Sequence, residues 1–314
     1  MGTPDFAVAS LSALVEAGFN IVSVITAPDK PAGRGQKINE SAVKKYAVEH
    51  NIPVLQPIKL KDSNFIEELK AYDADLQVVV AFRMLPEIVW NMPPMGTINL
   101  HGSILPQYRG AAPINWAIIN GETETGATTF FLQHEIDTGD ILFSDRMPIL
   151  NEDTAGDVHD KLMILGADLL VKTVKAIESG DYKEIPQHDL PVLSSDNKPT
   201  TADITSSNTL KHAPKIFKED CDINWDQPVM QVYNLIRGLS PYPTAFTYLQ
   251  EKTLKIFKVE IDYDLVTVKP GEFLTDSKTF LKFGCKDGYI LLKDLQLEGK
   301  KRMPVDEFLR GVRL

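Results

Sequence analysis

The chain has 314 residues, 43% of them hydrophobic and 24% charged, and a formal net charge of −10 at pH 7. This length allows two domains with a core in each, and the composition is typical of soluble globular proteins. No apolar run approaches the ~20 residues of a membrane-spanning helix, and the acidic excess argues against indiscriminate coating of nucleic acid. A signal peptide is absent and the two cysteines form no CxxC pair, which predicts a cytoplasmic protein with ordinary thiols.

From the N-terminus to about residue 180, strand-like and helix-like segments alternate. The segment 6–18 predicts a helix because its apolar residues recur on one face, with Asp5 as the expected cap and Gly18 as the expected stop. Short β-rich runs separated by helices are typical of a doubly wound, Rossmann-like and mostly parallel α/β sheet. Strands are predicted over 20–26, 52–57, 75–82, 96–102, 127–135 and 140–149, and further helices over 41–50, 64–73, 86–92, 112–121 and 154–180.

The start of the chain departs from this alternation. An open α/β domain normally enters its first helix from a strand, but here the loop MGTPD stands in that place. We therefore expect either a sheet that lacks a strand or a natural chain that begins further upstream.

The composition changes after the long helix. Residues 181–206 are rich in Pro, Ser, Thr and Asp without a sustained period, which predicts a linker between domains at 1–180 and 207–314. The second domain carries 17 basic and 15 acidic side chains and the rest of the chain 16 and 28, so an anionic macromolecule is expected to bind there or at local basic loops. A helix near 228–240 and closely spaced strands over 245–261, 272–275, 280–284 and 288–299 predict a small OB-like β-barrel.

The stretch GTINLHGSILPQYRGAAPI, residues 96–114, holds the most informative polar side chains. Asn99 and His101 alternate at the end of an apolar strand and therefore point to the same side. In open α/β sheets, ligands bind at the carboxyl ends of the strands.

A second acidic segment, HEIDTGDI, lies between two later strands of the same domain. It supplies Asp137, and Gly139 permits a tight turn that could bring this carboxylate to the imidazole. An amide and a protonated imidazole can stabilise an oxyanion, and an imidazole with a carboxylate can move a proton. The set therefore suits acyl transfer to an amine.

Other interpretations stay open at this point. His101 could be a strand-end histidine bonded to the backbone, and DTGD an ordinary turn. A metal site built from His101, His134, Asp137 and Asp140 is conceivable, but the spacing matches no strong ligand motif. Cofactor and hydrolase signatures are absent, because GRGQKI lacks a third glycine, no GxxxxGK[ST] loop occurs, and HGSIL is not a GxSxG elbow.

The motifs INLHGSILPQYRGAAPINWAI and EIDTGDI resemble the family of formyltransferases that use 10-formyltetrahydrofolate, and the resemblance extends over nearly the whole chain. GTPDFAV, APDKPAGRGQK, HAPKIFKEDCDINW and RGLSPYPTAF resemble the members that act on methionyl initiator tRNA. The HGS/LP and DTGD motifs are shared with relatives that formylate glycinamide ribonucleotide or amino sugars. The acceptor is therefore indicated by the PAGRG loop and the second domain.

The resemblance implies a role for each matching residue. It implies that Asn99, His101 and Asp137 are catalytic, and that the loop DKPAGRGQK reaches the acceptor end of tRNA. It implies no metal. The implied folate contacts are Ser103, Ile104, Leu105, Pro106, Phe82, Arg83, Met84, Leu85 and Asp140, and the expected tRNA contacts are Lys30, Arg34, Lys37, Lys300, Lys301 and Arg302.

The predicted activity is transfer of a formyl group from 10-formyltetrahydrofolate to the α-amine of methionine on initiator tRNA. The sequence holds no feature that requires an oligomer, so a monomer is expected. The nearest alternative is a formyltransferase acting on an amino-sugar nucleotide. A different class is a non-catalytic RNA- or folate-binding module, in which Asn99, His101 and Asp137 would have no reason to converge.

Two features depart from the family pattern. The family generally has a strand before the GTPDF turn, which puts folate binding and stability in question if the molecule starts at Met1. The second departure is AFRMLP, where this family more often has a glycine after the aromatic residue and one residue more. The rim of the pterin pocket is therefore less well defined than the catalytic face.

Overall fold

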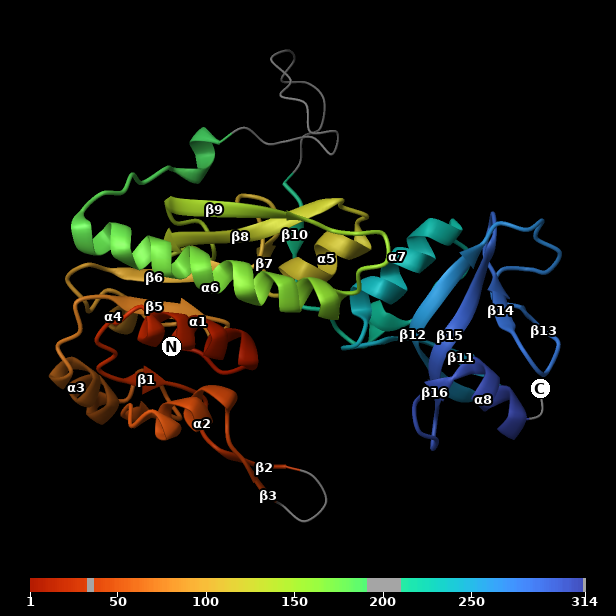
Figure 1. Cartoon of the computed structure of the whole chain (residues 1–314), viewed down its shortest axis with the longest axis horizontal. Coiled ribbons are helices and arrows are strands. Elements are labelled where there is room, and N and C mark those ends of the chain that lie inside the picture. The colour runs from red at the N-terminus through yellow and green to blue at the C-terminus, as the bar shows by residue number, and fades with distance from the viewer. Residues whose placement is uncertain (33–36, 191–209, 313–314) are drawn as a thin grey trace. The chain divides into compact units, whose positions relative to one another are not determined.

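The computed structural model describes residues 1–32, 37–190 and 210–312 (Figure 1). These residues form two compact units, each of which gathers segments that are separate in the sequence. Unit 1 comprises Met1–Arg109, Gly126–Met147 and His159–Lys211, and unit 2 comprises Gly110–Thr125, Pro148–Val158 and His212–Leu314. The expected linker 181–206 lies largely outside the described residues and stays a prediction.

Unit 1 is built on strands that alternate with helices, as the sequence pattern predicts, and its strand pairs are both parallel and antiparallel. In the four-stranded sheet, with order β5-β6-β8-β9, β5 and β6 are parallel while β6 and β8 are antiparallel. A separate parallel pair joins β1 to β4. The strands are β1 (Val24–Ile25), β2 (Lys30–Ala32), β3 (Lys37–Asn39), β4 (Val54–Leu55), β5 (Gln77–Val80), β6 (Thr97–His101), β7 (Arg109–Gly110), β8 (Glu124–Phe131) and β9 (Ile141–Pro148).

Helices cover this sheet and hold its strands in place. The longest, α6 (Ala155–Ser179), packs on β6 so closely that a Cβ on Gly166 would lie 2.9 Å from the Leu100 side chain. Thr173 on the same helix bonds Thr129 of β8 at 2.8 Å. The remaining helices of this unit are α1 (Asp5–Glu16), α2 (Ala42–Glu49), α3 (Ser63–Ala71) and α4 (Glu87–Trp90).

One expected cap is wrong. Asp5 does not cap α1, because the helix begins at Asp5 itself, with Pro4 in the capping position and no side-chain capping bond. The expected stop is confirmed: Gly18 follows the last turn with φ +85°, a backbone conformation that glycine adopts without steric cost.

The first two residues of the chain lie between β1 and β5. The Gly2 amide donates to the carbonyl of Ile25, the Val80 amide donates to the carbonyl of Met1, and the Met1 amine donates to the carbonyl of Val78 at 2.6 Å. Burial lowers the pKa of this amine to about 5. Met1 and Gly2 thus connect β1 to β5 by backbone hydrogen bonds.

A largely apolar cavity of about 550 Å³ occupies the same region. It is lined by residues of β1, β5, α1 and α6, among them Val24, Val78, Leu14 and Leu170. Ser10 also lines it, and its buried hydroxyl has no hydrogen-bond partner within the described part of the chain.

Unit 2 is a curled antiparallel sheet with flanking helices, which confirms the expected fold class (Figure 1). Its strand order is β11-β12-β15-β14-β13, with β16 paired to β15, and each adjacent pair is antiparallel. The elements are α5 (Pro113–Ile119), β10 (His212–Ala213), α7 (Val229–Leu239), β11 (Ala245–Leu249), β12 (Lys252–Asp262), β13 (Phe273–Thr275), β14 (Leu281–Gly284), β15 (Tyr289–Leu297), β16 (Met303–Pro304) and α8 (Val305–Gly311).

The core of unit 2 is apolar and contains both cysteines. Burial raises the pKa of the Cys221 thiol, and it raises the pKa of Cys285 to about 12, so neither is a ready thiolate nucleophile. Arg237 of α7 is also buried and donates to the carbonyl of Asp153 at 3.1 Å. Among the described residues of both units, no helix is long and apolar enough to cross a membrane.

Filling the cavity with a strand is expected to stabilise unit 1. An N-terminal extension of about six Val and Ile residues should raise the Tm by ~5 °C or more, because each buried aliphatic side chain contributes about 1.5–3 kcal/mol. A Gly/Ser extension of equal length is the control. If it raises the Tm as much as the apolar extension does, the cavity does not accept a strand.

The same variants test the buried amine. An amine whose pKa falls from 8.0 to about 5 on folding makes the unfolded chain bind more protons between these values, so stability should fall as the pH drops from 8 to 5. The full effect is on the order of 4 kcal/mol. Both extensions move the amine away, and denaturant titrations at pH 5 and 8 should show a smaller pH dependence for each extended chain than for the original.

Candidate functional site

The end of β6 presents the polar residues that the sequence singles out. Asn99 and His101 share one face of this strand, and Leu100 on the other face packs beneath α6. His101 is 7% exposed, whereas Asn99 is half-buried. Within the described residues the Asn99 carboxamide makes no hydrogen bond, so it is available to a ligand.

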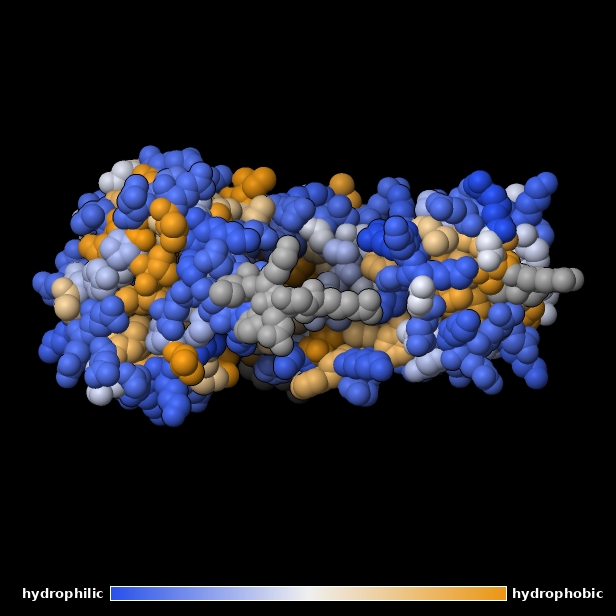
Figure 2. Space-filling model, turned by 90° about the horizontal axis from the view of Figure 1, so that it is seen from below, coloured by the Kyte–Doolittle hydropathy of each residue, from blue (hydrophilic) through white to orange (hydrophobic). Residues whose placement is uncertain are grey.

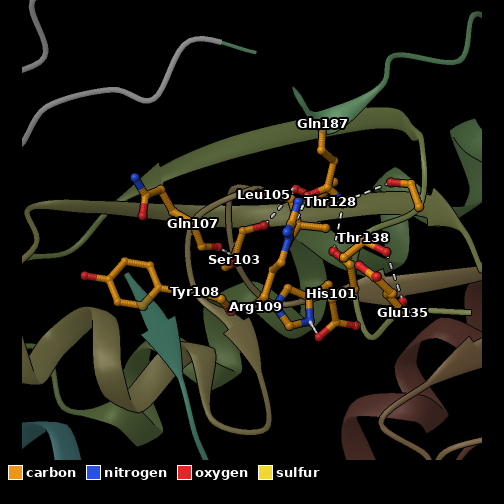
Figure 3. Close-up of polar contacts among 12 residues, drawn as sticks. His101, Ser103, Leu105, Gln107, Tyr108, Arg109, Thr128, Glu135, Thr138 and Gln187 are labelled. Carbon is orange, nitrogen blue, oxygen red and sulfur yellow. Dashed lines mark hydrogen bonds and ion pairs between the residues drawn. The ribbon is translucent and has the colours of Figure 1, made fainter. Parts of the chain in front are cut away.

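The loop after β6 fixes the imidazole of His101. The ring atom Nε2 lies 2.9 Å from the carbonyl oxygen of Tyr108, which can only accept, so Nε2 carries a hydrogen (Figure 3). Neutral His101 therefore has its lone pair on Nδ1. This atom is the ring nitrogen left for chemistry.

The loop itself is tied down at several points. The Ser103 hydroxyl donates to the carbonyl of Gln107 at 2.7 Å, and the Thr128 hydroxyl donates to the carbonyl of Ser103 at 2.7 Å. Tyr108 has a positive φ of 59°, and its amide donates to the carbonyl of Lys211 at 2.7 Å. These bonds hold the carbonyl that orients His101.

Asp137 approaches the free side of the imidazole. Its Oδ2 lies 3.8 Å from Nδ1 of His101, and the two side chains are 12% and 7% exposed. This distance exceeds a direct hydrogen bond but places an ionised carboxylate where it stabilises a protonated ring. The sequence prediction that the DTGD turn brings its carboxylate to His101 is therefore matched by this geometry.

The turn that carries Asp137 is unusually tight. Asp137 has φ +55°, and the Thr138 hydroxyl donates to the carbonyl of Glu135 at 3.1 Å. Gly139 passes so close to β8 that an added Cβ would lie 1.7 Å from the carbonyl oxygen of Phe131. Only glycine fits at this point.

The residues expected at the folate site differ in exposure. Ser103, Leu105 and Pro106 are buried, and Ile104 is half-buried. Most side chains of this segment therefore stabilise the conformation of the loop. Leu105 packs with Phe130 and Ile141. Asp140 is half-buried, and its carbonyl accepts from the Phe131 amide at 3.2 Å.

The second expected folate segment follows β5. Met84 is 72% exposed, whereas Leu85 lies in the core and Phe82 packs against it. The Arg83 guanidinium donates to the carbonyls of Pro57 and Ile58. Met84 is therefore the most exposed apolar residue of this segment.

The expected tRNA contacts fall on two surfaces. Lys30 is exposed at the start of the β2–β3 hairpin, Lys37 lies on β3, and Arg34 is outside the described residues. On unit 2, Lys300 and Lys301 are exposed. Arg302 is already paired with Asp294 at 2.5 Å and lies over the Phe257 ring, so its charge is partly compensated.

The base of the hairpin is held by a polar network. Asp29 accepts from the Lys44 ammonium and from the Gln56 amide at 2.8 Å, and the Lys44 bond lowers the pKa of this carboxyl. Gln56 also donates to the carbonyl of Ala27 at 2.9 Å.

No metal cluster is found in the described ranges, where no three His, Cys, Asp or Glu side chains gather to hold an ion. His134, an alternative ligand in the sequence analysis, is 74% exposed and lies 3.6 Å from Glu87.

Sequence reasoning missed two side chains of this site. Arg109 and Gln187 form a bonded pair beside the Asp137 turn (Figure 3). Gln187 falls in the segment expected to be a linker, and its described neighbour Ile185 pairs with Ile141 of β9. The residues IPQHD carry no periodicity, so nothing in the sequence alone pointed to this contact.

Comparisons with known proteins show the family of this chain. The sequence pattern of the formyl transferase family matches residues 1–174, and that of the formyl transferase C-terminal domain matches 215–313. The methionyl-tRNA formyltransferase of Phocaeicola vulgatus is 56% identical over 100% of this chain and 94% of its own length. That of Bacteroides fragilis is 55% identical with the same coverage.

A solved structure shows the same fold at low sequence identity. An N-formyltransferase from Helicobacter canadensis, in complex with folinic acid and dTDP-3-aminofucose, has a TM-score of 0.63 and 20% identity over 93% of this chain and 96% of its own.

Replacing Gly139 with alanine is expected to open the Asp137 turn. The added Cβ collides with backbone, which cannot yield cheaply, so the Tm should fall by ~5 °C or more in thermal unfolding. Gly311→Ala is the matched control, because a Cβ there meets no atom within 4 Å. Equal Tm values for the two variants would show that the turn has room to relax.

Proposed function

The chain belongs to the formyl transferase family, and we propose that it transfers a formyl group from 10-formyltetrahydrofolate to the α-amine of methionyl initiator tRNA. Relatives named for this activity match at 55–56% identity over the whole chain. The observation that carries the chemistry is the approach of Asp137 to Nδ1 of His101 at 3.8 Å. We expect the enzyme to act in the cytoplasm, where initiator tRNA is used, and to act as a monomer.

The proposed reaction needs no covalent enzyme intermediate. The neutral amine of methionine attacks the formyl carbon, a C–N bond forms, and the bond from that carbon to the folate nitrogen breaks. In this proposal the Asn99 amide and the protonated Nδ1 of His101 donate to the oxyanion that develops during attack. Asp137 orients His101 and helps to pass the amine proton to the departing folate nitrogen, so that protons balance.

The surface beside this site supports a flat, partly apolar donor. Met84, Ile88 and Ile136 are all more than half exposed, and they come from the segment after β5 and from the Asp137 turn. Nε2 of His134 lies 3.6 Å from Oε1 of Glu87, so these two segments are in contact. Figure 2 shows hydrophobic residues interspersed with hydrophilic ones on the face of unit 1 that it presents. The proposal includes contacts of the folate donor with three parts of the chain: Phe82–Leu85, Ser103–Pro106 and Asp140.

The protein is acidic overall, so the proposal places tRNA binding at local groups of exposed basic side chains. Lys30 is exposed at a hairpin whose base is fixed by Asp29, Lys44 and Gln56. A loop of this kind can contact phosphates and unpaired bases. Lys301 offers a further phosphate contact on unit 2 and is freer than Arg302, which is paired with Asp294.

His101→Ala is expected to lower kcat/KM for formylation of methionylated initiator tRNA by about 1,000-fold, since it removes both an oxyanion donor and a proton carrier. Activity is measured with 10-formyltetrahydrofolate as donor, beside a panel of amino-sugar nucleotides as acceptors. His159→Ala, which changes a partly exposed histidine on α6 that contacts Phe6, is the control. Near-wild-type kcat/KM in the His101 variant refutes the mechanism, and activity on the sugar nucleotides alone refutes the acceptor.

Salt dependence distinguishes the acceptors independently. The triple variant Lys30→Ala, Arg34→Ala, Lys37→Ala should raise the KM for tRNA and reduce its dependence on salt, because each phosphate contact contributes about 0.7–0.9 to the slope of log K against log salt. The KM for folate should not change. Lys70→Ala, an exposed lysine of α3, is the control. An unchanged salt slope in the triple variant contradicts a role for this loop in tRNA binding.

A further inference from the structure

Gln187 lies beyond α6, in the short 3-10 turn Gln187–Asp189, but its side chain ends beside the turn that carries Asp137 (Figure 3). Its Nε2 donates to the carbonyl oxygens of Asp137 at 2.9 Å and of Gly139 at 2.8 Å. Gln187 is 4% exposed, and both hydrogens of its amide group are used. One buried donor therefore binds the backbone on both sides of Thr138.

Arg109 fixes which way this amide points. Its Nε and Nη2 donate to Oε1 of Gln187 at 2.9 and 2.6 Å. A guanidinium has only donors, so a rotated amide would set NH₂ against N–H and carbonyl against carbonyl. The orientation that serves the Asp137 turn is thus the one that Arg109 allows.

The turn needs such support. Asp137 has φ +55°, in the left-handed region that non-glycine residues adopt only at an energetic cost when nothing compensates. Holding the carbonyls of residues 137 and 139 fixes the peptide planes that follow Asp137. That in turn fixes the direction in which its carboxylate leaves the backbone toward His101.

We propose that Gln187, oriented by Arg109, is a positioning residue for formyl transfer that acts through the backbone of the Asp137 turn. This inference rests on the proposed function. A merely structural residue would lower stability and leave the chemistry of the folded enzyme unchanged. A positioning residue lowers kcat in folded enzyme, and it does so only while the Asp137 carboxylate is present.

The test is a double-mutant comparison in the full-length chain, with formylation of methionylated initiator tRNA as the assay. Gln187→Leu should lower kcat at least ~10-fold, because small misplacements of a catalytic group have effects of this size. The KM values for folate and tRNA should stay within about twofold. In an Asp137→Asn background, measured by single turnover, the same change should alter the rate by less than about twofold.

Two further variants keep the test decisive if Gln187→Leu folds poorly. Gln187→Glu keeps the acceptor for Arg109 but cannot donate to the two carbonyls, so it should lower kcat as far as Gln187→Leu. Arg109→Lys cannot donate two hydrogen bonds to Oε1 in the same geometry and should lower kcat by a smaller factor. Gln77→Leu is the matched control, since Gln77 is a buried glutamine of β5 in the same unit.

The outcomes separate this inference from the function on which it rests. If the unmodified chain does not formylate methionyl-tRNA, the proposed function fails. If it does, the positioning role is overturned by either of two results: Gln187→Leu loses the same factor in the Asp137→Asn background as in the chain that keeps Asp137, or it loses no more than Gln77→Leu. Loss confined to the chain that keeps the Asp137 carboxylate supports the role.

Discussion

Two backbone carbonyl groups decide where the imidazole and the carboxylate meet. The Tyr108 carbonyl binds Nε2 of His101 and so turns Nδ1 toward Asp137. The Asp137 carbonyl, held by Gln187, fixes the turn from which the carboxylate extends. Neither side chain is placed by its strand alone. The separation of 3.8 Å is thus a property of two loops, each fixed by hydrogen bonds from a third segment of the chain.

The sequence predicted those parts of the molecule whose structure is local. Asn99 and His101 share a face because side chains alternate along a strand, and the helices from α1 to α7 follow from apolar periodicity, although Asp5 does not cap the first. Long-range contacts were beyond such reasoning. The amide of Tyr108 donates to the carbonyl of Lys211. Gln187 lies in a segment whose composition suggests a linker, and it bonds to Asp137, 50 residues earlier in the chain.

The N-terminal residues connect two strands that belong to different sheets of unit 1. Met1 and Gly2 bond to Val78, Val80 and Ile25 and so bridge β5 and β1 at one end. A cavity of about 550 Å³ lies beside these two residues, and burial lowers the pKa of the Met1 amine to about 5. Val80 ends β5, which pairs directly with β6, and β6 ends at His101. The strand that carries the imidazole thus pairs directly with a strand that lines this cavity.

Engagement of Nε2 restricts what His101 can do during the proposed reaction. With that hydrogen held by a carbonyl, a single nitrogen, Nδ1, must both donate to an oxyanion and take part in proton movement. It cannot do both in the same protonation state. A neighbouring carboxylate resolves this conflict, because it favours the protonated ring during attack and can itself accept the amine proton as the intermediate forms. In the proposed mechanism, Asp137 is therefore needed because Tyr108 holds His101 in this tautomer, and the two loops act together.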